Sequence, residues 1–413
     1  MHVVLEREVV VLSAARTPVG RFDGALADLE AVELGGLAIA AAVARAGLPP
    51  AAVDTVTMGI VVSAGLGVGA AKRAALRAGL APTIHSRTVD AVCGSAMDAV
   101  AFGIESLLAG SAEVVVAGGM ESRSNAPYLL RARFRRDTEN FSRGARLHVK
   151  RAGAYRFALA DHAEEQLQGT EIVDPTAYDG LFCADQRMFM RQYALAFAAK
   201  QGYTAETINR FAAESHRKAA EAVARGLFRQ EIVPAGDASD DDLVPEERLA
   251  RELQENPDDL ASLYNSSTPA DGAAALVLVT GERARERGLR PIARVLGYAR
   301  VDTPAADFLS APVTAVQELV GALRAARKPA DFTIIEANEA FGIQLPLFAE
   351  AFAGMTINVH GGAIALGHPL GAAGARITTT LLYAMQRYGH RRGLSAICYG
   401  GGGGYALAVE AMD

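Results

Sequence analysis

Short runs of β-branched residues alternate with alanine-rich segments of helical period, first over residues 8–117 and again over residues 273–399. Strands that alternate with helices in this way form a layered α/β fold in which helices cover both faces of the sheet. In the first block the pattern predicts strands at Glu8–Ser13, Thr55–Val62 and Glu113–Ala117, and helices at Ala31–Ala46, Ala70–Ala78 and Ser95–Leu108.

The second block repeats the organisation of the first. Its predicted strands are Ala273–Thr280, Ile292–Leu296, Phe332–Glu336, Met355–Val359 and Ser395–Tyr399. In both blocks a turn of small residues opens a long helix, a strand follows, and a glycine cluster ends the unit. Cys93-Gly-Ser95 leads in this way to Gly118-Gly119, and His368-Pro-Leu-Gly371 leads to Gly400–Gly404. We interpret the two blocks as a diverged internal duplication.

The middle of the chain has a different character. Residues 131–156 hold nine Lys/Arg and two acids, whereas residues 237–259 hold ten acids and two Arg. A helix is predicted at Glu206–Ala224, but the surrounding sequence is charged and typical of loops. We therefore expect residues 122–267 to be an inserted domain. The first half would be 1–121, completed by 268–291, and the second half would be 292–413.

Charge and cysteine content narrow the function classes. A net charge of −6 argues against a general nucleic-acid binder. Three cysteines cannot form a disulfide framework, so a reducing cytoplasm is expected. The N-terminus lacks the pattern of a secretory signal, and its longest nearby apolar run, residues 34–44, is far shorter than the ~20 residues of a membrane span.

Cys93 is the first candidate reactive residue. It lies between an apolar segment and the helix predicted from Ser95. The unpaired N–H groups and the positive dipole end of a helix N-terminus favour a thiolate, and therefore a nucleophile. The alternative is a small buried hydrophobic residue, which is a common role of free cysteine.

Three further residues stand in similar contexts. His368 lies in a Gly-His-Pro-Leu-Gly turn, Cys398 ends a strand before five consecutive glycines, and Asn338 follows the strand predicted up to Glu336. Glycines let the backbone approach a ligand and present N–H groups to an anion. The structural alternatives are a loop histidine, a buried cysteine and a helix cap, respectively.

One motif points elsewhere. Gly65-Leu-Gly-Val-Gly-Ala70 fits a dinucleotide-binding fingerprint between a strand and a helix, and Asp90 follows 20 residues after Ala70. In a chain with 41 glycines a chance match is easy. Asp90 also directly precedes the Cys93 segment instead of ending a strand of its own, which argues against this alternative.

Taken together, these segments resemble the thiolase family. The resemblance is carried by an ordered set of motifs spread over most of the chain, of which the run from Gly361 to Gly374 is the most specific. The motifs are Ser13-Ala-Ala-Arg-Thr-Pro-Val-Gly20, Val92-Cys-Gly-Ser95, Gly118-Gly-Met-Glu-Ser-Arg-Ser-Asn-Ala-Pro127, Asn338-Glu-Ala-Phe341, Gly361-Gly-Ala-Ile-Ala-Leu-Gly-His-Pro-Leu-Gly-Ala-Ala-Gly374 and Cys398-Tyr-Gly-Gly-Gly402.

The resemblance implies a fold and a chemistry. The fold is two similar βαβαβαββ halves, each with a five-stranded mixed sheet, in layered α-β-α-β-α packing with an inserted loop domain. Cys93 would attack an acyl-CoA thioester while His368 takes its proton. Cys398 would then remove an α-proton from a second acyl-CoA, and the carbanion would attack the acyl group on Cys93. This is a reversible Claisen condensation, and the reverse direction is thiolysis by CoA.

The family also implies the supporting groups. One oxyanion hole would consist of His368 and a water held by Asn338, and the other of the backbone N–H groups of Cys93 and Gly400. Ser267 matches the position that contacts the CoA pantetheine arm, although a Ser/Thr-rich turn is the alternative. No metal or redox cofactor is implied, because CoA thioesters are the substrates. A homodimer or homotetramer and a role in fatty acid metabolism are also implied.

Two alternatives and several departures accompany this prediction. A ketoacyl-synthase-like condensing enzyme would need a decarboxylating histidine where this chain has Asn338, and a silent acyl-CoA-binding or scaffold protein would be expected to lack Cys93 or His368. Asp90 and His360 replace the usual asparagines and Gly403 a usual methionine, so the acyl pocket or the subunit interface could differ. The basic stretch 131–156 could attract CoA phosphates or, with less support, an acidic acyl carrier protein.

Overall fold

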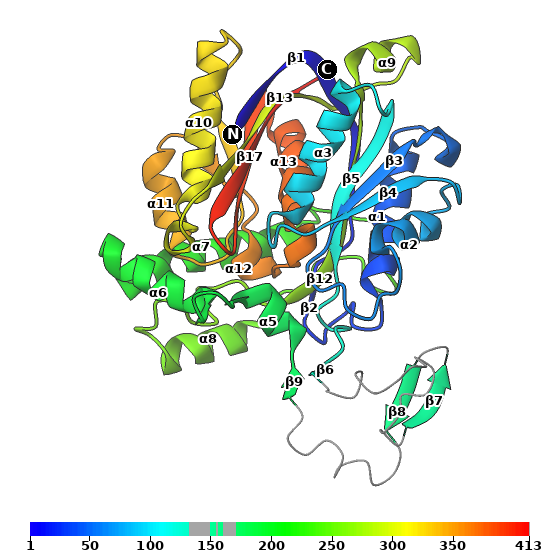
Figure 1. Ribbon diagram of the computed structural model, residues 1–413. Helices are drawn as coiled ribbons and strands as arrows, with labels where there is room; N and C mark the ends of the chain where they lie inside the picture. Colours follow the sequence, from blue (N-terminus) through cyan, green and yellow to red (C-terminus); the bar gives the residue numbers. More distant parts are fainter. Residues whose placement is uncertain (132–148, 154–155, 160–170, 413) are drawn as a thin grey trace.

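The computed structural model describes residues 1–131, 149–153, 156–159 and 171–412 of the chain. Its first half follows the order βαβαβαββ (Figure 1). The elements are β1 (His2–Arg16), α1 (Ala31–Arg45), β3 (Thr55–Gly59), α2 (Ala70–Arg77), β4 (His85–Val89), α3 (Ser95–Leu108), β5 (Val114–Glu121) and, after the insertion, β12 (Ala270–Thr280). The short strand β2 (Gly20–Arg21) pairs with β12.

The second half repeats this order after the linking helix α9 (Gly281–Glu286). Its elements are β13 (Ala293–Asp302), α10 (Ala311–Ala325), β14 (Ile334–Ala337), α11 (Gln344–Ala351), β15 (Thr356–Ile357), α12 (Ala363–Leu366), α13 (Ala373–Tyr388), β16 (Arg392–Tyr399) and β17 (Gly403–Ala411). Short 3-10 turns lie at Pro50–Ala52, Ala305–Asp307 and Leu370–Ala372.

Each half contributes five strands to the sheet, as the family resemblance implies. The first set runs β4-β3-β5-β12-β1 and the second β13-β17-β16-β14-β15, with parallel and antiparallel pairs in both. One feature was not predicted. β1 and β13 are also hydrogen-bonded to each other in antiparallel register, Val9 opposite Val295, so both sets belong to one continuous ladder within the described residues.

The helices complete five layers. Figure 1 shows α3 and α13 side by side between the two strand sets, with α1 and α2 outside the first set and α10 and α11 outside the second. Separate apolar clusters fill the gaps, and the central cluster joins Met97, Ile104 and Leu381 to strands of both halves. The predicted α-β-α-β-α packing is therefore present.

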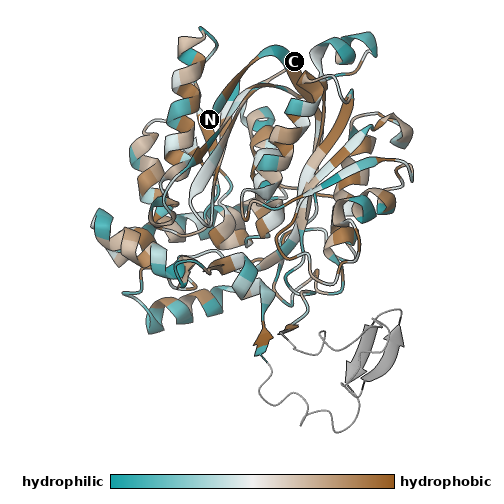
Figure 2. Ribbon diagram, viewed as in Figure 1, coloured by the Kyte–Doolittle hydropathy of each residue, from teal (hydrophilic) through white to brown (hydrophobic). Residues whose placement is uncertain are grey.

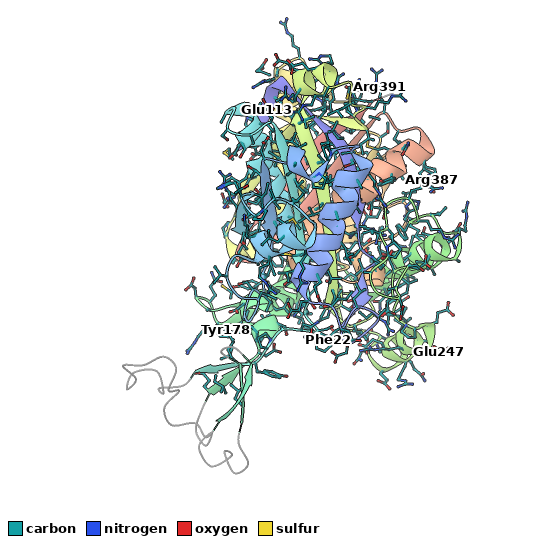
Figure 3. All side chains as sticks on the ribbon, turned by 90° about the vertical axis from the view of Figure 1, so that its right-hand side faces the viewer. Phe22, Glu113, Tyr178, Glu247, Arg387 and Arg391 are labelled. Atoms are coloured by element: carbon teal, nitrogen blue, oxygen red, sulfur yellow. The ribbon has the colours of Figure 1, made fainter. Side chains whose placement is uncertain are left out.

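The position of α3 follows from its sequence. Only a few of its residues reach solvent, so it is apolar on nearly all sides, as a helix in a central layer must be. Figure 2 shows the hydrophobic colours concentrated on the central strands, whereas α8 (Glu246–Glu255) and α9 are largely hydrophilic. In Figure 3 the labelled side chains of Glu113, Arg387 and Arg391 extend from the outer surface.

The insertion between β5 and β12 lies below the sheet in Figure 1. Besides α8, its elements are β6 (Leu129–Arg131), β7 (Val149–Gly153), β8 (Arg156–Leu159), β9 (Glu171–Val173), α5 (Pro175–Leu181), β10 (Phe182–Cys183), β11 (Met188–Phe189), α6 (Met190–Gln201) and α7 (Ala205–Ala224). An apolar cluster packs α6 and α7 against the second half through Phe197, Ile208 and Ile343. Most of the basic stretch 131–156 lies outside the described residues.

A buried ion cluster ties the insertion to the first half. The Arg16 guanidinium, on β1, is 0% exposed and donates to Glu231 at 2.6 Å and to both Asp241 oxygens at 2.6 and 2.8 Å. Charges that are removed from water in this way are stable only when paired and hydrogen-bonded. Within the described residues, no helix is long and apolar enough to cross a membrane.

Candidate active site

A strained turn presents Cys93. Val92 has a φ of 50°, a left-handed conformation that is rare for a β-branched residue. The Asp90 carboxylate accepts from the Val92 N–H at 3.0 Å, and the Ser95 hydroxyl accepts from the Ala91 N–H at 2.8 Å and donates to the Val92 carbonyl at 2.6 Å. These bonds hold the turn, so Cys93 is fixed immediately before α3. Backbone strain of this kind is typical of functional sites.

The environment of Cys93 corrects one prediction. The helix N-terminus was expected to favour the thiolate, but Cys93 is only 8% exposed, and burial raises the pKa of its thiol. Desolvation of the charged form therefore outweighs the helix dipole. Three groups oppose this rise: the N–H groups of Gly400 and of Cys93 itself, which hydrogen-bond the sulfur, and the charge of Arg123.

Cys398 lies near Cys93 in space although 305 residues separate them in the sequence. It is the penultimate residue of β16 and is 0% exposed. Burial raises its pKa to about 12, partly offset by a hydrogen bond from the Gln344 side chain. A charge on Cys398 raises the pKa of Cys93, so the two thiols resist simultaneous ionisation.

His368 and Asn338 form a second pair. Asn338 Nδ2 and His368 Nε2 are 3.5 Å apart, and both residues are buried. Burial, followed by the charges of Arg376 and Arg123, lowers the pKa of His368 to about 3, so its imidazole is neutral at physiological pH. Asn338 is not a helix cap, because Ile343 occupies the N-cap of α11.

Two polar atoms of this pair remain unpaired among the described residues, namely Asn338 Oδ1 and His368 Nδ1. A buried polar atom without a partner costs about 1–3 kcal/mol, so proteins retain few of them. Asn265 Oδ1, Ser266 Oγ and Thr268 Oγ1, in the adjoining segment, share this condition. Such a concentration of unpaired polar atoms is typical of a surface that binds a polar ligand or water.

The segment around Ser267 connects the two loops that carry Asn338 and His368. Ser267 donates to the Ala340 carbonyl through both its N–H, at 3.1 Å, and its hydroxyl, at 2.9 Å. One residue on, the Thr268 carbonyl accepts from the His368 N–H at 2.9 Å. Ser267 is half-buried, so part of its side chain remains accessible.

Two buried carboxylates that sequence reasoning missed hold the site loops. Glu339 accepts from the Ser215 hydroxyl and the Asn358 amide, each at 2.7 Å, and from the Ile364 N–H at 3.2 Å. Glu121 accepts from the N–H groups of Val61, Val62 and Gly371. Both lie inside the recognised motifs, but their partners lie far away in the sequence, so only the fold reveals these roles.

The predicted reactive residues therefore fall into two pairs, one coupled through charge and the other in contact. The Gly400 N–H lowers the pKa of Cys93 and a charge on Cys398 raises it, whereas His368 contacts Asn338. Arg123 links the pairs electrostatically, because its charge acts on both Cys93 and His368. Among the described residues, no group of three or more His, Cys, Asp or Glu side chains is arranged to hold a metal ion.

Comparison with known proteins identifies the family. The profile of the thiolase N-terminal domain matches residues 9–282, and that of the thiolase C-terminal domain matches residues 289–411. The chain is a member of the thiolase family. An acetyl-CoA acetyltransferase of Escherichia coli is 38% identical over 98% of this chain and 100% of its own length. One from Cupriavidus necator is 36% identical over 98% and 99%, respectively.

Solved structures agree with this membership. The Acat5 thiolase from Ascaris suum, in complex with coenzyme A, matches with a TM-score of 0.82 at 32% identity, over 98% of this chain and all of that one. The Bacillus anthracis acetyl-CoA acetyltransferase matches with a TM-score of 0.84 at 29% identity, over 98% and 99%. These matches show that the chain is an acyltransferase of the thiolase type. They favour the predicted activity over a silent binding protein and over a ketoacyl-synthase-like enzyme.

The departures from the family pattern now have local explanations. The Asp90 carboxylate accepts a hydrogen bond from the Val92 N–H and so stabilises the turn that carries Cys93. Asp90 therefore has a structural role there and not the role it would have in a dinucleotide-binding motif. His360 is buried against Phe228 and its Nε2 lies 3.0 Å from the Tyr388 hydroxyl. Burial lowers the pKa of His360 to about 4, so it does not titrate near neutral pH. A side chain at Gly403 would collide with the ring of Tyr399.

Proposed function

We propose that this thiolase transfers acyl groups between CoA thioesters through an acyl-Cys93 intermediate. The Cys93 sulfur attacks the thioester carbon, its proton passes to His368, and CoA leaves as a thiol after taking up that proton. The neutral state of His368 at physiological pH is compatible with this role, because only the neutral imidazole can accept a proton. Among the described residues, His368 Nδ1 has no hydrogen-bond partner and Nε2 hydrogen-bonds only Asn338. No described carboxylate therefore binds the imidazole.

Cys398 acts as the base of the second half-reaction. Its thiolate removes the α-proton of a second acyl-CoA, the carbanion attacks the acyl carbon on Cys93, and the Cys93 sulfur leaves and regains the proton from Cys398. The effect of a charged Cys398 on the pKa of Cys93 supports this order. Once Cys93 is acylated it no longer ionises, so Cys398 can lose a proton without a charged neighbour.

Two sets of donors stabilise the oxyanions. The observation that carries the proposal is that the backbone N–H groups of Gly400 and of Cys93 lower the pKa of the Cys93 thiol, which places both donors where they could act on an acyl group attached to that sulfur. It would act together with the Cys93 N–H on the acyl carbonyl oxygen. His368, with a water held by Asn338, would bind the enolate oxygen. Loss of one such donor typically reduces the rate ~10²–10³-fold.

Acetyl-CoA is the substrate we propose, because the bacterial relatives are named acetyl-CoA acetyltransferases and the Ascaris relative binds coenzyme A. Ser267 would contact the pantetheine arm of CoA, since its accessible side lies beside the loops of Asn338 and His368. The reaction uses CoA thioesters as substrates and needs no metal or redox cofactor, because protein groups supply the nucleophile, the base and the oxyanion donors.

We further propose a homodimer or homotetramer that works in fatty acid metabolism in the cytoplasm. β4 supports the assembly: it ends the strand order, and no described strand pairs with its outer edge, so a second copy could add there. The reduced cysteines support the location. The division into residues 1–121 with 268–291, 122–267 and 292–413 follows the two βαβαβαββ units and remains part of this proposal.

Steady-state kinetics test the proposal. Thiolysis of 3-oxoacyl-CoA by CoA is followed for the wild type and for Cys93→Ala and Cys398→Ala, with Cys183→Ala as the matched control. Cys183 is the third free cysteine and lies in the insertion. We expect Cys93→Ala and Cys398→Ala to lose at least ~10²-fold in kcat, and Cys183→Ala to match the wild type. Full turnover by Cys93→Ala would refute the mechanism, and CoA binding without turnover by the wild type would indicate a silent protein.

A further inference from the structure

Two tyrosines flank the reactive turn of the second half. Tyr399 directly follows Cys398, and Tyr405 lies on the next strand, β17, opposite Ile397. Their ring centroids are 5.5 Å apart, and the Arg300 guanidinium lies 5.8 and 5.7 Å from the two ring centres. Such a distance is within reach of a cation–π interaction, so Arg300 holds both rings together. We refer to Tyr399 and Tyr405 as the tyrosine pair.

Tyr405 connects β17 to the turn that carries Cys93. Its ring lies directly on Gly94: a Cβ at that glycine would be only 2.6 Å from a Tyr405 ring carbon. Its hydroxyl donates to the Asp98 carboxylate of α3 at 2.8 Å. A half-buried carboxylate strengthens such a bond, and Asp98 lies in the first turn of α3. Tyr405 therefore fixes the start of α3, two residues after Cys93, against β17.

Tyr399 holds the glycine turn in the same way. Its hydroxyl donates to Asp302 at the end of β13, and its ring fills the space that a side chain at Gly403 would need. At Gly402 the φ of 116° admits only glycine without strain, and the Thr303 N–H donates to the Gly402 carbonyl at 3.1 Å. The turn that contains Gly400 is thus attached to the last residue of β13 and to the residue that follows it.

The ionisation of the pair suits this role. Burial, followed by the hydrogen bond to Asp302, raises the pKa of Tyr399 to about 12, and burial with the charge of Asp98 raises the pKa of Tyr405 further. Both hydroxyls therefore keep their protons and act as donors throughout the physiological pH range. Arg300 is held in turn by Asp302 at 3.2 Å.

We propose that Tyr399 and Tyr405 are positioning residues, which hold the Gly400 N–H and the Cys398 sulfur in register with Cys93. The two residues act through the backbone and not on the substrate. The assignment rests on the proposed roles of Cys93, Cys398 and Gly400. A displacement of about 1 Å in a catalytic constellation can reduce the rate ~10²-fold, so a loosened turn has a measurable effect.

Tyr399→Phe and Tyr405→Phe test the proposal, and Tyr298→Phe is the matched control. Tyr298 is also a buried tyrosine of the second half, and its hydroxyl donates at 2.6 Å to Glu105, two turns further along the same helix α3. The control therefore also removes a hydrogen bond from a tyrosine hydroxyl to a carboxylate of α3. That bond starts from β13, away from the turn that follows Cys398.

Two readouts separate positioning from general stability. We expect kcat of Tyr399→Phe and Tyr405→Phe to fall at least ~10-fold with KM within about twofold, and Tyr298→Phe to retain the wild-type kcat. The second readout is the pH dependence of Cys93 alkylation by iodoacetamide, which needs no acyl substrate. Because the Gly400 N–H lowers the pKa of Cys93, a displaced turn should shift the alkylation profile to higher pH.

The outcomes distinguish this inference from the proposed function. Equal effects of all three substitutions on both readouts would overturn the positioning role and leave a structural one. Wild-type kcat and an unchanged alkylation profile in Tyr399→Phe and Tyr405→Phe would also overturn it. Failure of the thiolase mechanism would show instead as full turnover by Cys93→Ala, while the alkylation profiles of the tyrosine variants would still report on the turn.

Discussion

Replacement of Asn338 by aspartate probes the field at His368 more sharply than removal of the side chain. The substitution keeps the shape of Asn338 but introduces a carboxylate about where its amide now lies, 3.5 Å from His368 Nε2. In the wild type the pKa of His368 is lowered to about 3 by burial and by the nearby arginines. An adjacent negative charge opposes both effects, because it stabilises the imidazolium.

The size of the effect follows from the distance. Two unit charges 3.5 Å apart attract by about 5 kcal/mol at an effective dielectric constant of about 20. Because 1.36 kcal/mol corresponds to one pKa unit, this attraction would raise the pKa of His368 from about 3 to between about 6 and 7. Histidine would then change its charge within the working pH range, and below that pKa it would no longer accept the proton of Cys93.

The assay is the pH dependence of kcat for thiolysis between pH 5 and 8. We expect Asn338→Asp to lose activity as the pH falls through a new ionisation near 6–7, and Asn338→Ala to be slower by ~10²–10³ without one. Asn256→Asp, at the exposed C-cap of α8, serves as the control and should keep the wild-type profile. Identical profile shapes for Asn338→Asp and Asn338→Ala would refute the proximity of position 338 to His368.

Two further predictions follow from the buried acids and thiols. Cys398→Ser should reduce turnover ~10²–10⁴-fold but leave the alkylation of Cys93 by iodoacetamide at pH 8 unchanged, because burial raises the pKa of Cys398 to about 12 and its thiol is neutral at this pH; an altered alkylation rate would contradict the neutral state of Cys398. Burial raises the pKa of Glu336 to about 8, so the folded chain keeps a proton that the unfolded chain releases, and stability falls as the pH rises from about 4.5 to 8. Urea unfolding of Glu336→Gln should therefore show its largest gain over the wild type at pH 8, and an equal gain at pH 5 would contradict this.

The regular elements were the most predictable part of the fold. The helix Ser95–Leu108 has the predicted bounds, because its apolar residues repeat at helical spacing and Gly94 precedes it. The strand predicted up to Val62 ends at Gly59 instead. The reason is tertiary: the N–H groups of Val61 and Val62 donate to the Glu121 side chain and not to a neighbouring strand. A local pattern carries no information about such a partner.

Edge strands and long-range pairings could not be predicted either, because they also depend on partners that are distant in the sequence. β4 has the sequence His-Ser-Arg-Thr-Val, which is largely exposed at the edge of the sheet and lacks an apolar signature. The continuation of β1 to His2 was also missed, because the exposed Glu6 and Arg7 interrupt its apolar run while the strand continues beside β13. Pairing partners, and not residue types, define both elements.

The sequence motifs predicted which residues form the candidate site, but not the environment of these residues. Cys93, Asn338, His368 and Cys398 stand in segments typical of the family, so their roles could be proposed from the sequence. The state of Cys93 could not, because the burial that raises its pKa arises from packing and outweighs the helix N-terminus. The same holds for Tyr405 and Asp98, which are 307 residues apart and share no recognisable motif.

The central claim is that Cys93 carries the acyl group. Intact-protein mass spectrometry after incubation with acetyl-CoA, without free CoA, measures this directly in the wild type, Cys93→Ala and Cys183→Ala. We expect a mass increase of one acetyl group per chain in the wild type and in Cys183→Ala, and none in Cys93→Ala. An acetyl adduct of equal yield in Cys93→Ala, or none in a folded wild type that binds CoA, would contradict it.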